Sequence, residues 1–391
     1  MNTATVKPQA THLRTVPNIR SKRTGPPRGK RTNLFVTLFL LVVTLLVLGL
    51  LMVLSSSAVV SVGDSGSAWR SFNRQATAAA VGFIAMVALM RINYHSLKKL
   101  AVPGTVLICV FLVMLLVTPY GVTRRGATRW LDLGVMPFQP SEFAKLALIC
   151  FIARILSQPS RDLHGDASKL VPVTFCCGVF AVLFMMQPHL GNTLILGGIA
   201  LAMLFWAGTK MRYMLPAGAI AIVCAAFYVW NTPWRRERLF SMLDPWSDPQ
   251  GSTFQILNSL HAITTGGIRG SGLGDGLSKW GFVPYSHSDF IFAVVAEELG
   301  FVGASATVLL FLGIGIVGYT VALRATDTFG MLLAVGITSW IVVQATLNLG
   351  SVIGLLPTVG VTLPMMSHGG SALVAVMAGC GILLNIARQS R

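Results

Sequence analysis

The sequence has little charge. Only 11% of its 391 residues are Asp, Glu, Lys or Arg, and 54% are hydrophobic. A soluble domain carries roughly 25% charged residues, so this composition argues against an ordinary soluble globular protein. Several long segments contain no charged residue at all, and a membrane-spanning helix needs about 20 apolar residues. Because these segments do not alternate polar and apolar residues as β-barrel strands do, we expect an all-α polytopic membrane protein.

Acids are scarcer than bases. The chain has 13 Asp and Glu against 30 Lys and Arg, and its formal net charge is +17. Eight of the basic residues lie in residues 1–32, which contain no acid. Such charge could indicate nucleic-acid binding, but its position ahead of the first apolar run is typical of a disordered cytoplasmic tail, residues 1–33, near anionic lipid. We therefore expect no nucleic-acid partner.

The sequence also lacks paired cysteines. No CxxC motif and no pair of loop cysteines occurs, so we interpret the cysteines as small buried hydrophobic residues. The seven His and six Cys residues never approach the spacing of zinc ligands, and we predict no His/Cys metal site. No cleavable signal peptide is expected, because a long basic tail precedes the first apolar run. The six cysteines are Cys109, Cys150, Cys176, Cys177, Cys224 and Cys380.

Ten apolar segments are candidate membrane spans. Cytoplasmic connections carry an excess of Lys and Arg, and most basic residues fall on the side of the tail. We therefore expect both termini in the cytoplasm, one membrane domain at 34–391, and a large extracellular loop, 231–288, between the seventh and eighth spans. The expected spans are 34–55, 75–91, 100–118, 140–157, 169–187, 190–208, 212–231, 301–323, 328–349 and 370–388.

One apolar stretch, SHSDFIFAVVAEELG at Ser286–Gly300, contains carboxylates, which are costly in hydrocarbon. A helix over 289–324 would be roughly 54 Å long at 1.5 Å per residue, which exceeds a bilayer core of about 30 Å. We expect a break at Gly300, with a short helix dipping in from the outer face before the span at 301–323. The carboxylates would then face a water-filled cavity rather than lipid.

The first carboxylate, Asp289, has three possible roles: general base, ion-coupling site or helix N-cap. On a helix, Glu297 lies about 80° around the axis from Asp289, whereas Glu298 lies on the opposite side. We expect Glu297 to share a cavity with Asp289, and Glu298 to bind backbone or a neighbouring helix.

The stretch GATRWLDLGVMPFQPSEFAKLAL begins with arginines and ends in an expected helix. Glu142 and Lys145 are neighbours at i and i+3, so they could form an ion pair with each other. Lys145 could instead pair with Asp289 and hold it ionised. Arg124, Arg125 and Arg129 precede the helix start and indicate an anion site, because arginine binds phosphate bidentately and helix N-termini attract anions.

Two further stretches are rich in backbone-breaking residues. The Gly-rich 265–289 fits neither a dinucleotide-binding nor a P-loop pattern. It could be a flexible hinge or a backbone surface for a ligand, with Arg269 and Lys279 at its rim. The Pro- and Gly-rich 354–371 is expected to line a cavity, since non-helical backbone at membrane depth is tolerated there. His189 and His368 are expected to be hydrogen-bonded structural residues.

Together these stretches resemble motifs of the SEDS family (shape, elongation, division and sporulation), whose members polymerise peptidoglycan. The motifs are GATRWLDLG…QPSEFAKLALI, LDPWSDPQGSTFQI, HSDFIFAVVAEELG and GLLPTVGVTLP…SHGGS, in the family's order. The likeness covers residues 34–391 and is closer to the division branch, FtsW-like, than to the elongation branch, RodA-like. The family usually has Asp at the position of His189, Tyr at that of His368, and often Lys at that of Val359.

The resemblance implies a glycosyl transfer that polymerises lipid II at the outer face of the bacterial cytoplasmic membrane during cell division. Asp289 matches the proposed catalytic base, and undecaprenyl pyrophosphate would leave with inversion. Positive charge for that leaving group could come from Arg129, Lys145, Arg269 or a divalent cation; no other cofactor is implied. Expected substrate-binding residues are Arg129, Gln139, Glu142, Lys145, Gln187, Arg269, Lys279, His287, Ser288, Glu297, Ser367 and Gly369.

The resemblance also implies partners, namely a class B penicillin-binding transpeptidase and other divisome membrane proteins. Two other functions stay open. A lipid II flippase also carries intramembrane carboxylates and broken helices, but the sequence shows no inverted repeat. An inactive scaffold for division proteins is the third interpretation.

Overall fold

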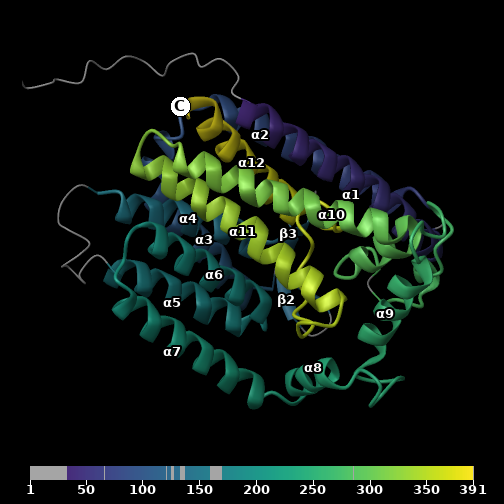
Figure 1. Cartoon of the computed structure of the whole chain (residues 1–391). Coiled ribbons are helices and arrows are strands. Elements are labelled where there is room, and N and C mark those ends of the chain that lie inside the picture. The colour runs from purple at the N-terminus through teal and green to yellow at the C-terminus, as the bar shows by residue number, and fades with distance from the viewer. Residues whose placement is uncertain are drawn as a thin grey trace, which may run out of the picture.

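The computed structural model is a bundle of long helices with a small sheet and further helices at one end (Figure 1). The predicted basic tail, except its last residue, and Arg125 lie outside the described residues. The described residues are 33–65, 67–119, 121–124, 127–132, 137–158, 170–284 and 286–390.

Ten helices cover the ten segments expected to cross the membrane. Seven of the described helices are long and apolar enough to do so, namely α1–α3, α7 and α10–α12, while α5 and α6 are apolar but shorter. The chain is therefore a multi-pass membrane protein. The ten helices are α1 (Asn33–Ser65), α2 (Arg70–Arg91), α3 (Ser96–Val117), α4 (Pro140–Leu156), α5 (Leu170–Met186), α6 (Leu190–Trp206), α7 (Met211–Trp230), α10 (Ile291–Leu323), α11 (Thr328–Val352) and α12 (Gly370–Gln389).

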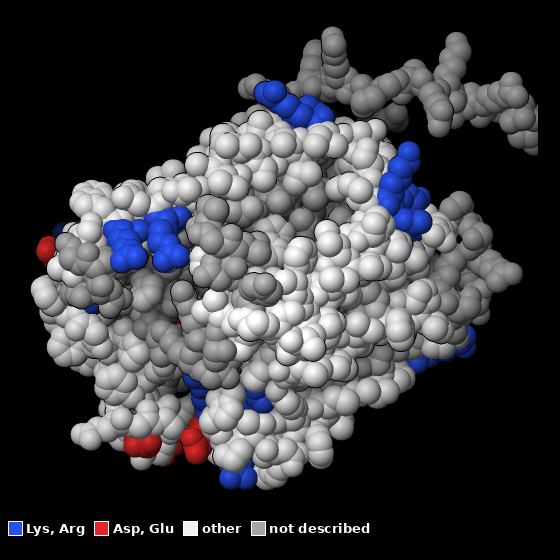
Figure 2. All heavy atoms as spheres, turned by 180° about the vertical axis from the view of Figure 1, so that it is seen from behind, with Lys and Arg blue, Asp and Glu red and all other residues white. Residues whose placement is uncertain are grey.

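The surface agrees with this assignment. Figure 2 shows a wide uncharged area on one face, with the coloured Lys, Arg, Asp and Glu side chains around its margins. Large apolar side chains are exposed along several helices, including Phe175 at 72%, Phe227 at 71% and Phe301 at 70%. Such continuous apolar surface would be unfavourable in water and suits contact with lipid chains.

The helices differ in how deeply they are buried. Most residues of α11 and α12 are buried, whereas on α7 only Met214 is buried. Figure 1 shows α7 at the margin of the bundle, leading into α8. The helix α7 therefore has one side facing α6 and much of its remaining surface exposed.

The all-α expectation missed a small sheet. The strands β1 (Gly121–Arg124), β2 (Ala127–Asp132) and β3 (Pro137–Phe138) form an antiparallel sheet in the order β1-β2-β3. These strands have two to six residues and lie outside the long charge-free runs from which the helices were predicted. The large loop 231–288 also contains helices: α8 (Pro233–Leu243), α9 (Phe254–Gly266) and the short 3₁₀ helix η2 (Ser278–Trp280).

The predicted break in α10 is confirmed. Gly300 has φ 68° and ψ −167°, a conformation that favours glycine. An added Cβ there would lie 2.3 Å from the backbone nitrogen of Gly270. The Gly-rich loop therefore packs its backbone directly against the broken helix.

The loop replaces the helical hydrogen bonds that the break removes. The amide of Ser271 donates to the Glu297 carbonyl at 2.9 Å, and the amide of Phe301 donates to the Gly267 carbonyl at 2.8 Å. Equivalent bonds run from Gly272 to the Glu298 carbonyl at 3.1 Å and from Val302 to Ile268 at 3.3 Å. Because buried backbone groups need partners, these bonds hold the Gly-rich loop against the broken helix.

Candidate active site

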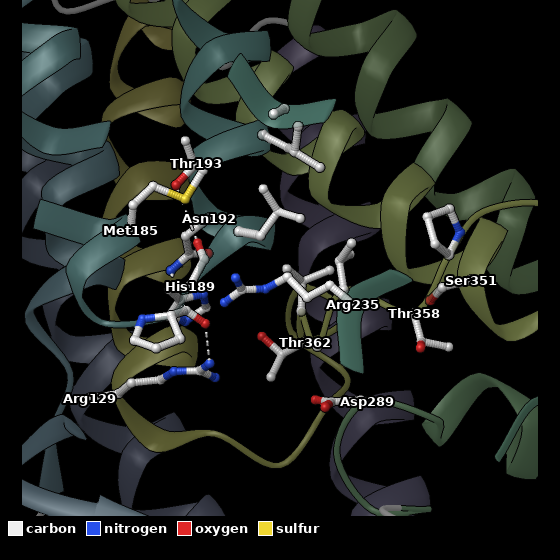
Figure 3. Close-up of a pocket in the computed structure, with 18 of the residues that line it drawn as sticks. Arg129, Met185, His189, Asn192, Thr193, Arg235, Asp289, Ser351, Thr358 and Thr362 are labelled. Carbon is white, nitrogen blue, oxygen red and sulfur yellow. Dashed lines mark hydrogen bonds between the residues drawn. The ribbon is translucent and has the colours of Figure 1, made fainter. Parts of the chain in front are cut away.

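Asp289 lies at the wall of a cavity of about 2050 Å³. It is half-buried and directly precedes the N-cap residue Phe290, whose side chain makes no capping bond. The N-cap position of α10 is therefore Phe290 and not Asp289. In Figure 3, Asp289, Thr362, Arg129 and Arg235 surround one open space.

The backbone of Asp289 is fixed by α11. The side-chain amide of Asn348 donates to the Asp289 carbonyl at 2.7 Å and to the Val361 carbonyl at 2.8 Å. Asn348 is 1% exposed, so it ties two otherwise separate segments together inside the protein. The carboxylate is thus held next to Gly360, where an added Cβ would lie 3.8 Å from Asp289 Oδ2.

The segment that contains Val361, residues 353–369 between α11 and α12, is called the strap. As predicted for this stretch, strap residues line the cavity. Ser367 Oγ donates to the Ser288 carbonyl at 2.6 Å, and the His368 amide donates to the His287 carbonyl at 2.9 Å. The strap therefore runs beside the segment that carries Asp289 and fixes its course.

Arg129 brings positive charge to the cavity from β2. Its guanidinium donates to the carbonyls of Gln187 at 3.3 Å and Pro188 at 2.6 Å. Burial lowers the pKa of Arg129, while the negative charge of Asp289 acts in the opposite direction. Because a guanidinium is always charged in proteins, Arg129 stays protonated and faces Asp289 as a fixed cation.

Lys145 does not pair with Asp289. Its ammonium, fully buried on α4, lies 2.8 Å from Glu142, 2.9 Å from the Gln344 amide oxygen and 3.4 Å from the Asn192 amide oxygen. A lysine has three N–H donors, and these three partners use all of them. The alternative of a Glu142–Lys145 ion pair is confirmed, and the Asp289–Lys145 pair is wrong.

Glu297 does not share the cavity with Asp289. Its carboxylate accepts from the amides of Leu277 at 2.8 Å and Ser278 at 3.1 Å, and so holds η2 against α10. Glu298 accepts from the Ser55 hydroxyl at 2.6 Å, which confirms its predicted contact with a neighbouring helix. The break at Gly300 and the docked loop explain why the helical-wheel argument failed for Glu297, because the loop covers its side of the helix.

His189 lies between α5 and α6 at the cavity wall. Burial, together with the positive charges of Arg129 and Lys145, holds its pKa well below 6.5. Its Nε2 lies 3.4 Å from the amide nitrogens of both Gln139 and Asn192, which can only donate. The imidazole is therefore neutral and accepts at Nε2.

The predicted site residues fall into three groups. Lys145, Gln187 and Ser367 are buried behind the cavity wall, and Arg269, Lys279 and Glu297 belong to the Gly-rich loop, η2 and the break in α10. The side chain of Arg124 and all of Arg125 lie outside the described residues. The predicted residues that line the cavity are Asp289, Arg129, Gln139, Glu142, His287, Ser288 and Gly369.

Sequence reasoning missed two cavity residues on α8, Arg235 and Arg238. Both belong to the stretch TPWRRERL in the expected extracellular loop. The available signal was a cluster of arginines beside a tryptophan on the side of the membrane where basic residues are less common.

One wall of the cavity is largely apolar. Its wall between α5, α6 and α7 consists mainly of small and aliphatic side chains, among them Val182, Gly197, Ile222, Ala225 and Val229. The cavity therefore joins a charged end near Asp289 to an apolar end between membrane helices. Such a shape suits a molecule with a polar head and a hydrocarbon chain.

Comparisons with known proteins agree with this organisation. Residues 36–391 match the FtsW/RodA/SpoVE family, described as "Cell cycle protein". Stage V sporulation protein E of Bacillus subtilis is 37% identical over 93% of this chain and 99% of its own length. A probable peptidoglycan glycosyltransferase FtsW of Geobacter metallireducens is 38% identical over 91% of this chain and 95% of its own.

Solved structures are also similar. A chain from a peptidoglycan synthase complex, solved in a study of how polymerization and crosslinking are coordinated, superposes with a TM-score of 0.73. It is 29% identical, and the match covers 90% of this chain and 96% of that one. The rod shape determining protein RodA of Thermus thermophilus gives a TM-score of 0.66 at 26% identity, over 90% of this chain and 96% of RodA.

Proposed function

The chain belongs to the FtsW/RodA/SpoVE family of cell cycle proteins, and from this premise we propose that it is a peptidoglycan glycosyltransferase that polymerises lipid II. The observation that carries the proposal is the position of Asp289. A half-buried carboxylate lies at the charged end of a cavity whose other end is apolar and lies between membrane helices. A lipid-linked sugar needs both ends: one for its reacting groups and one for its chain.

In the proposed mechanism, the Asp289 carboxylate accepts the proton of the acceptor's 4-hydroxyl group. The hydroxyl oxygen forms a bond to the anomeric carbon of the donor sugar, and the bond from that carbon to the diphosphate oxygen breaks. The diphosphate leaves on its lipid with the electron pair, from the opposite face, so the configuration inverts. One base suffices, which agrees with the position of Glu297 away from the cavity.

Positive charge near the breaking bond would stabilise the departing diphosphate. Arg129 faces the cavity as a fixed cation and interacts electrostatically with Asp289. Lys145 and Arg269 were also expected to stabilise the leaving group. Lys145 is instead paired with Glu142, and Arg269 is exposed outside the cavity. Asn348 and the strap hold the base in place against this cation.

We further propose ten crossings of the bacterial cytoplasmic membrane, with α4, α5 and α6 as the shorter spans. In Figure 1 the C-terminus lies at the end of the bundle opposite α8 and α9. With basic residues 1–32 in the cytoplasm, both termini are inside and the cavity's charged end faces outside. A crosslinking transpeptidase is the proposed partner, since the similar solved chain comes from a polymerising and crosslinking complex. A division role is proposed from the FtsW-like relatives.

The test is polymerisation of labelled lipid II by the full chain in lipid vesicles, with and without a class B transpeptidase and with and without a chelator. We expect glycan polymer from the wild type and a fall of roughly a hundredfold or more in Asp289→Asn. The matched control is Asp275→Asn, an exposed acid of the outer loop that does not line the cavity. Polymer at the wild-type rate from Asp289→Asn would refute the base, and lipid II translocation without polymer would favour the flippase.

A further inference from the structure

Gln75 of α2 is a cavity residue whose side chain binds the strap. The residue is 1% exposed, and both ends of its side-chain amide bind backbone groups. Nε2 donates to the Ser367 carbonyl at 3.1 Å, and Oε1 accepts from the Gly369 amide at 3.1 Å. With the amide flipped, its NH₂ group would face the Gly369 amide and its oxygen would face the Ser367 carbonyl, so these bonds fix its orientation. Gln75 therefore holds the strap at the residues on both sides of His368.

The same strap residues also bind the segment that carries Asp289. Ser367 Oγ donates to the Ser288 carbonyl, and the His368 amide donates to the His287 carbonyl. Both accepting carbonyls belong to the two residues that directly precede Asp289. A continuous chain of hydrogen bonds therefore leads from α2 through the strap to the backbone next to the proposed base.

The strap also packs closely on α1 at Gly49. An added Cβ at Gly49 would lie 2.3 Å from the Met365 carbonyl oxygen and 2.7 Å from the Met366 Cα. Met365 is 3% exposed and has φ 63°, which is uncommon for a residue other than glycine. Such a conformation persists only where the surrounding structure holds it. Contacts with α1 and α2 therefore determine the course of the strap just before it reaches the Asp289 segment.

The Asp289 segment depends on such contacts for its position. Residues 286–290 form turns and belong to neither a helix nor a strand. Asn348 of α11 fixes the carbonyl of Asp289 itself, whereas the strap fixes the two residues before it. A general base must lie within hydrogen-bond reach of the proton that it accepts, and a displacement of about 1 Å can lower a rate roughly a hundredfold. Losing the support from the strap would therefore slow the reaction even if the cavity stayed intact.

We propose that Gln75 is a positioning residue for the reaction: acting through Ser367 and His368, it sets the position of the Asp289 carboxylate. The proposal rests on the proposed function for one point, the identity of Asp289 as the base. Gln75 takes no proton in this role, because both of its polar atoms bind the backbone of the strap. Its contribution is to the geometry of the base.

Steady-state polymerisation of labelled lipid II by the full chain in lipid vesicles tests this role. The variant Gln75→Leu keeps the approximate size of the side chain and removes both bonds to the strap. We expect its kcat per folded molecule to fall roughly tenfold or more, because a displaced base weakens the transition state. KM should change by less than about threefold, because substrate binding does not use the Gln75 amide.

The matched control is Asn385→Leu on α12. Asn385 is fully buried, and its side-chain amide donates to the Leu89 carbonyl at 2.7 Å and to the Ile92 carbonyl. It therefore also holds two backbone carbonyls of another segment, but it does not line the cavity. Asn385→Leu should lower the thermal unfolding temperature as Gln75→Leu does, and its kcat per folded molecule should equal that of the wild type.

Amide hydrogen exchange provides a second measurement, which does not depend on activity. In the wild type the Gly369 amide is bound by Gln75, and the His368 amide is bound by the His287 carbonyl. We expect both strap amides to exchange roughly tenfold faster or more in Gln75→Leu, because the strap opens locally more often. They should exchange in Asn385→Leu as they do in the wild type.

A double variant tests the route through the strap. Ser367→Ala removes the hydroxyl that binds the Ser288 carbonyl. The effects of Gln75→Leu and Ser367→Ala on kcat should combine to less than the product of the two factors, because both variants loosen the same contact. A full product would mean that Gln75 does not act through Ser367, and it would overturn the proposal.

The other outcomes separate this proposal from the proposed function. Equal falls of kcat per folded molecule in Gln75→Leu and Asn385→Leu, or a rise of KM alone in Gln75→Leu, would overturn the positioning role. If Asp289→Asn abolishes polymerisation while Gln75→Leu reacts as the wild type does, the reaction stands and the positioning role fails. If the wild type makes no polymer, the proposed reaction fails, and the exchange of the His368 amide still decides whether Gln75 fixes the strap beside Asp289.

Discussion

The side-chain amide of Asn348 lies 2.7 Å from the backbone carbonyl of Asp289 and 2.8 Å from that of Val361. Through this one side-chain amide, α11 fixes the backbone of both Asp289, the proposed base, and the strap. Replacing Asn348 with Leu keeps the approximate side-chain size but leaves both carbonyls without this buried donor. Each unsatisfied buried group costs about 1–3 kcal/mol.

We therefore expect Asn348→Leu to lower the thermal unfolding temperature and to reduce polymerisation by more than its loss of folded protein explains. The measurement is polymerisation rate per folded molecule, with lipid diphosphate binding as a second readout of the intact cavity. Thr307→Val is the control, since it removes a buried hydroxyl bond to the Gly303 carbonyl in the second half of α10. Equal rates per folded molecule in both variants would show that Asn348 is structural only.

The Glu142–Lys145 pair predicts strongly non-additive effects on stability. Lys145→Met leaves the Glu142 carboxylate, 4% exposed, without its cation. Removing one member of a buried ion pair costs about 3–5 kcal/mol, whereas removing both costs much less. We expect the double variant Glu142→Gln/Lys145→Met to unfold at a higher temperature than Lys145→Met alone. Additive effects in this double-mutant cycle would contradict the proposed coupling.

The long apolar helices could be predicted from the sequence because their signal is local. Each expected span coincides with a helix, and the break at Gly300 followed from comparing the length of one segment with the thickness of a bilayer. The small sheet could not be found in this way. Its strand β2 is six residues long and contains Arg129 and Asp132, so it has no apolar run to detect.

The site was predicted less completely, because it depends on contacts between distant segments. Asp289 stood out as a carboxylate beside an apolar run, and the cavity at the strap followed from its Pro and Gly residues. For Lys145 the sequence offered either a neighbour on the same helix or a distant acid as partner. The structure places the neighbour, Glu142, 2.8 Å away. Arg235 becomes a site residue only because α8 folds back over the cavity, which no local pattern in the loop predicts.

A substitution at Gly300 tests whether the packing of the Gly-rich loop against α10 depends on the break in that helix. Alanine at this position would need φ 68° and would place its Cβ 2.3 Å from the Gly270 nitrogen and 2.5 Å from the Ile268 carbonyl oxygen. Backbone atoms on both sides cannot give way, so we expect Gly300→Ala to destabilise the protein by about 3 kcal/mol or more. The control is Gly104→Ala on α3, where an added Cβ meets nothing within 4 Å.

The variants Gly300→Ala and Gly104→Ala are compared by thermal unfolding in detergent and by the rate of proteolysis of the loop 266–272. Gly104→Ala should unfold at or slightly above the wild-type temperature, because alanine favours a helix over glycine. Gly300→Ala should expose the loop to protease at temperatures where the wild type resists. An unchanged cleavage rate in Gly300→Ala would mean that the loop does not depend on the break.

His189 predicts how stability changes with pH. Its pKa in the folded protein lies well below 6.5, because burial and the charges of Arg129 and Lys145 oppose its protonation. In the unfolded chain it protonates near its ordinary value, so below about pH 6.5 the unfolded state binds more protons and stability falls as the pH falls. The loss approaches about 1.4 kcal/mol per pH unit while the folded imidazole stays neutral.

The variant His189→Gln has no imidazole to protonate at this position. It should therefore lose less stability than the wild type between pH 7 and pH 5, as measured by thermal unfolding. His261→Gln, an exposed histidine on α9, is the control and should follow the wild type. Parallel pH profiles for His189→Gln and the wild type would show that His189 is protonated equally in the folded and unfolded states, against the neutral imidazole that accepts from Gln139 and Asn192.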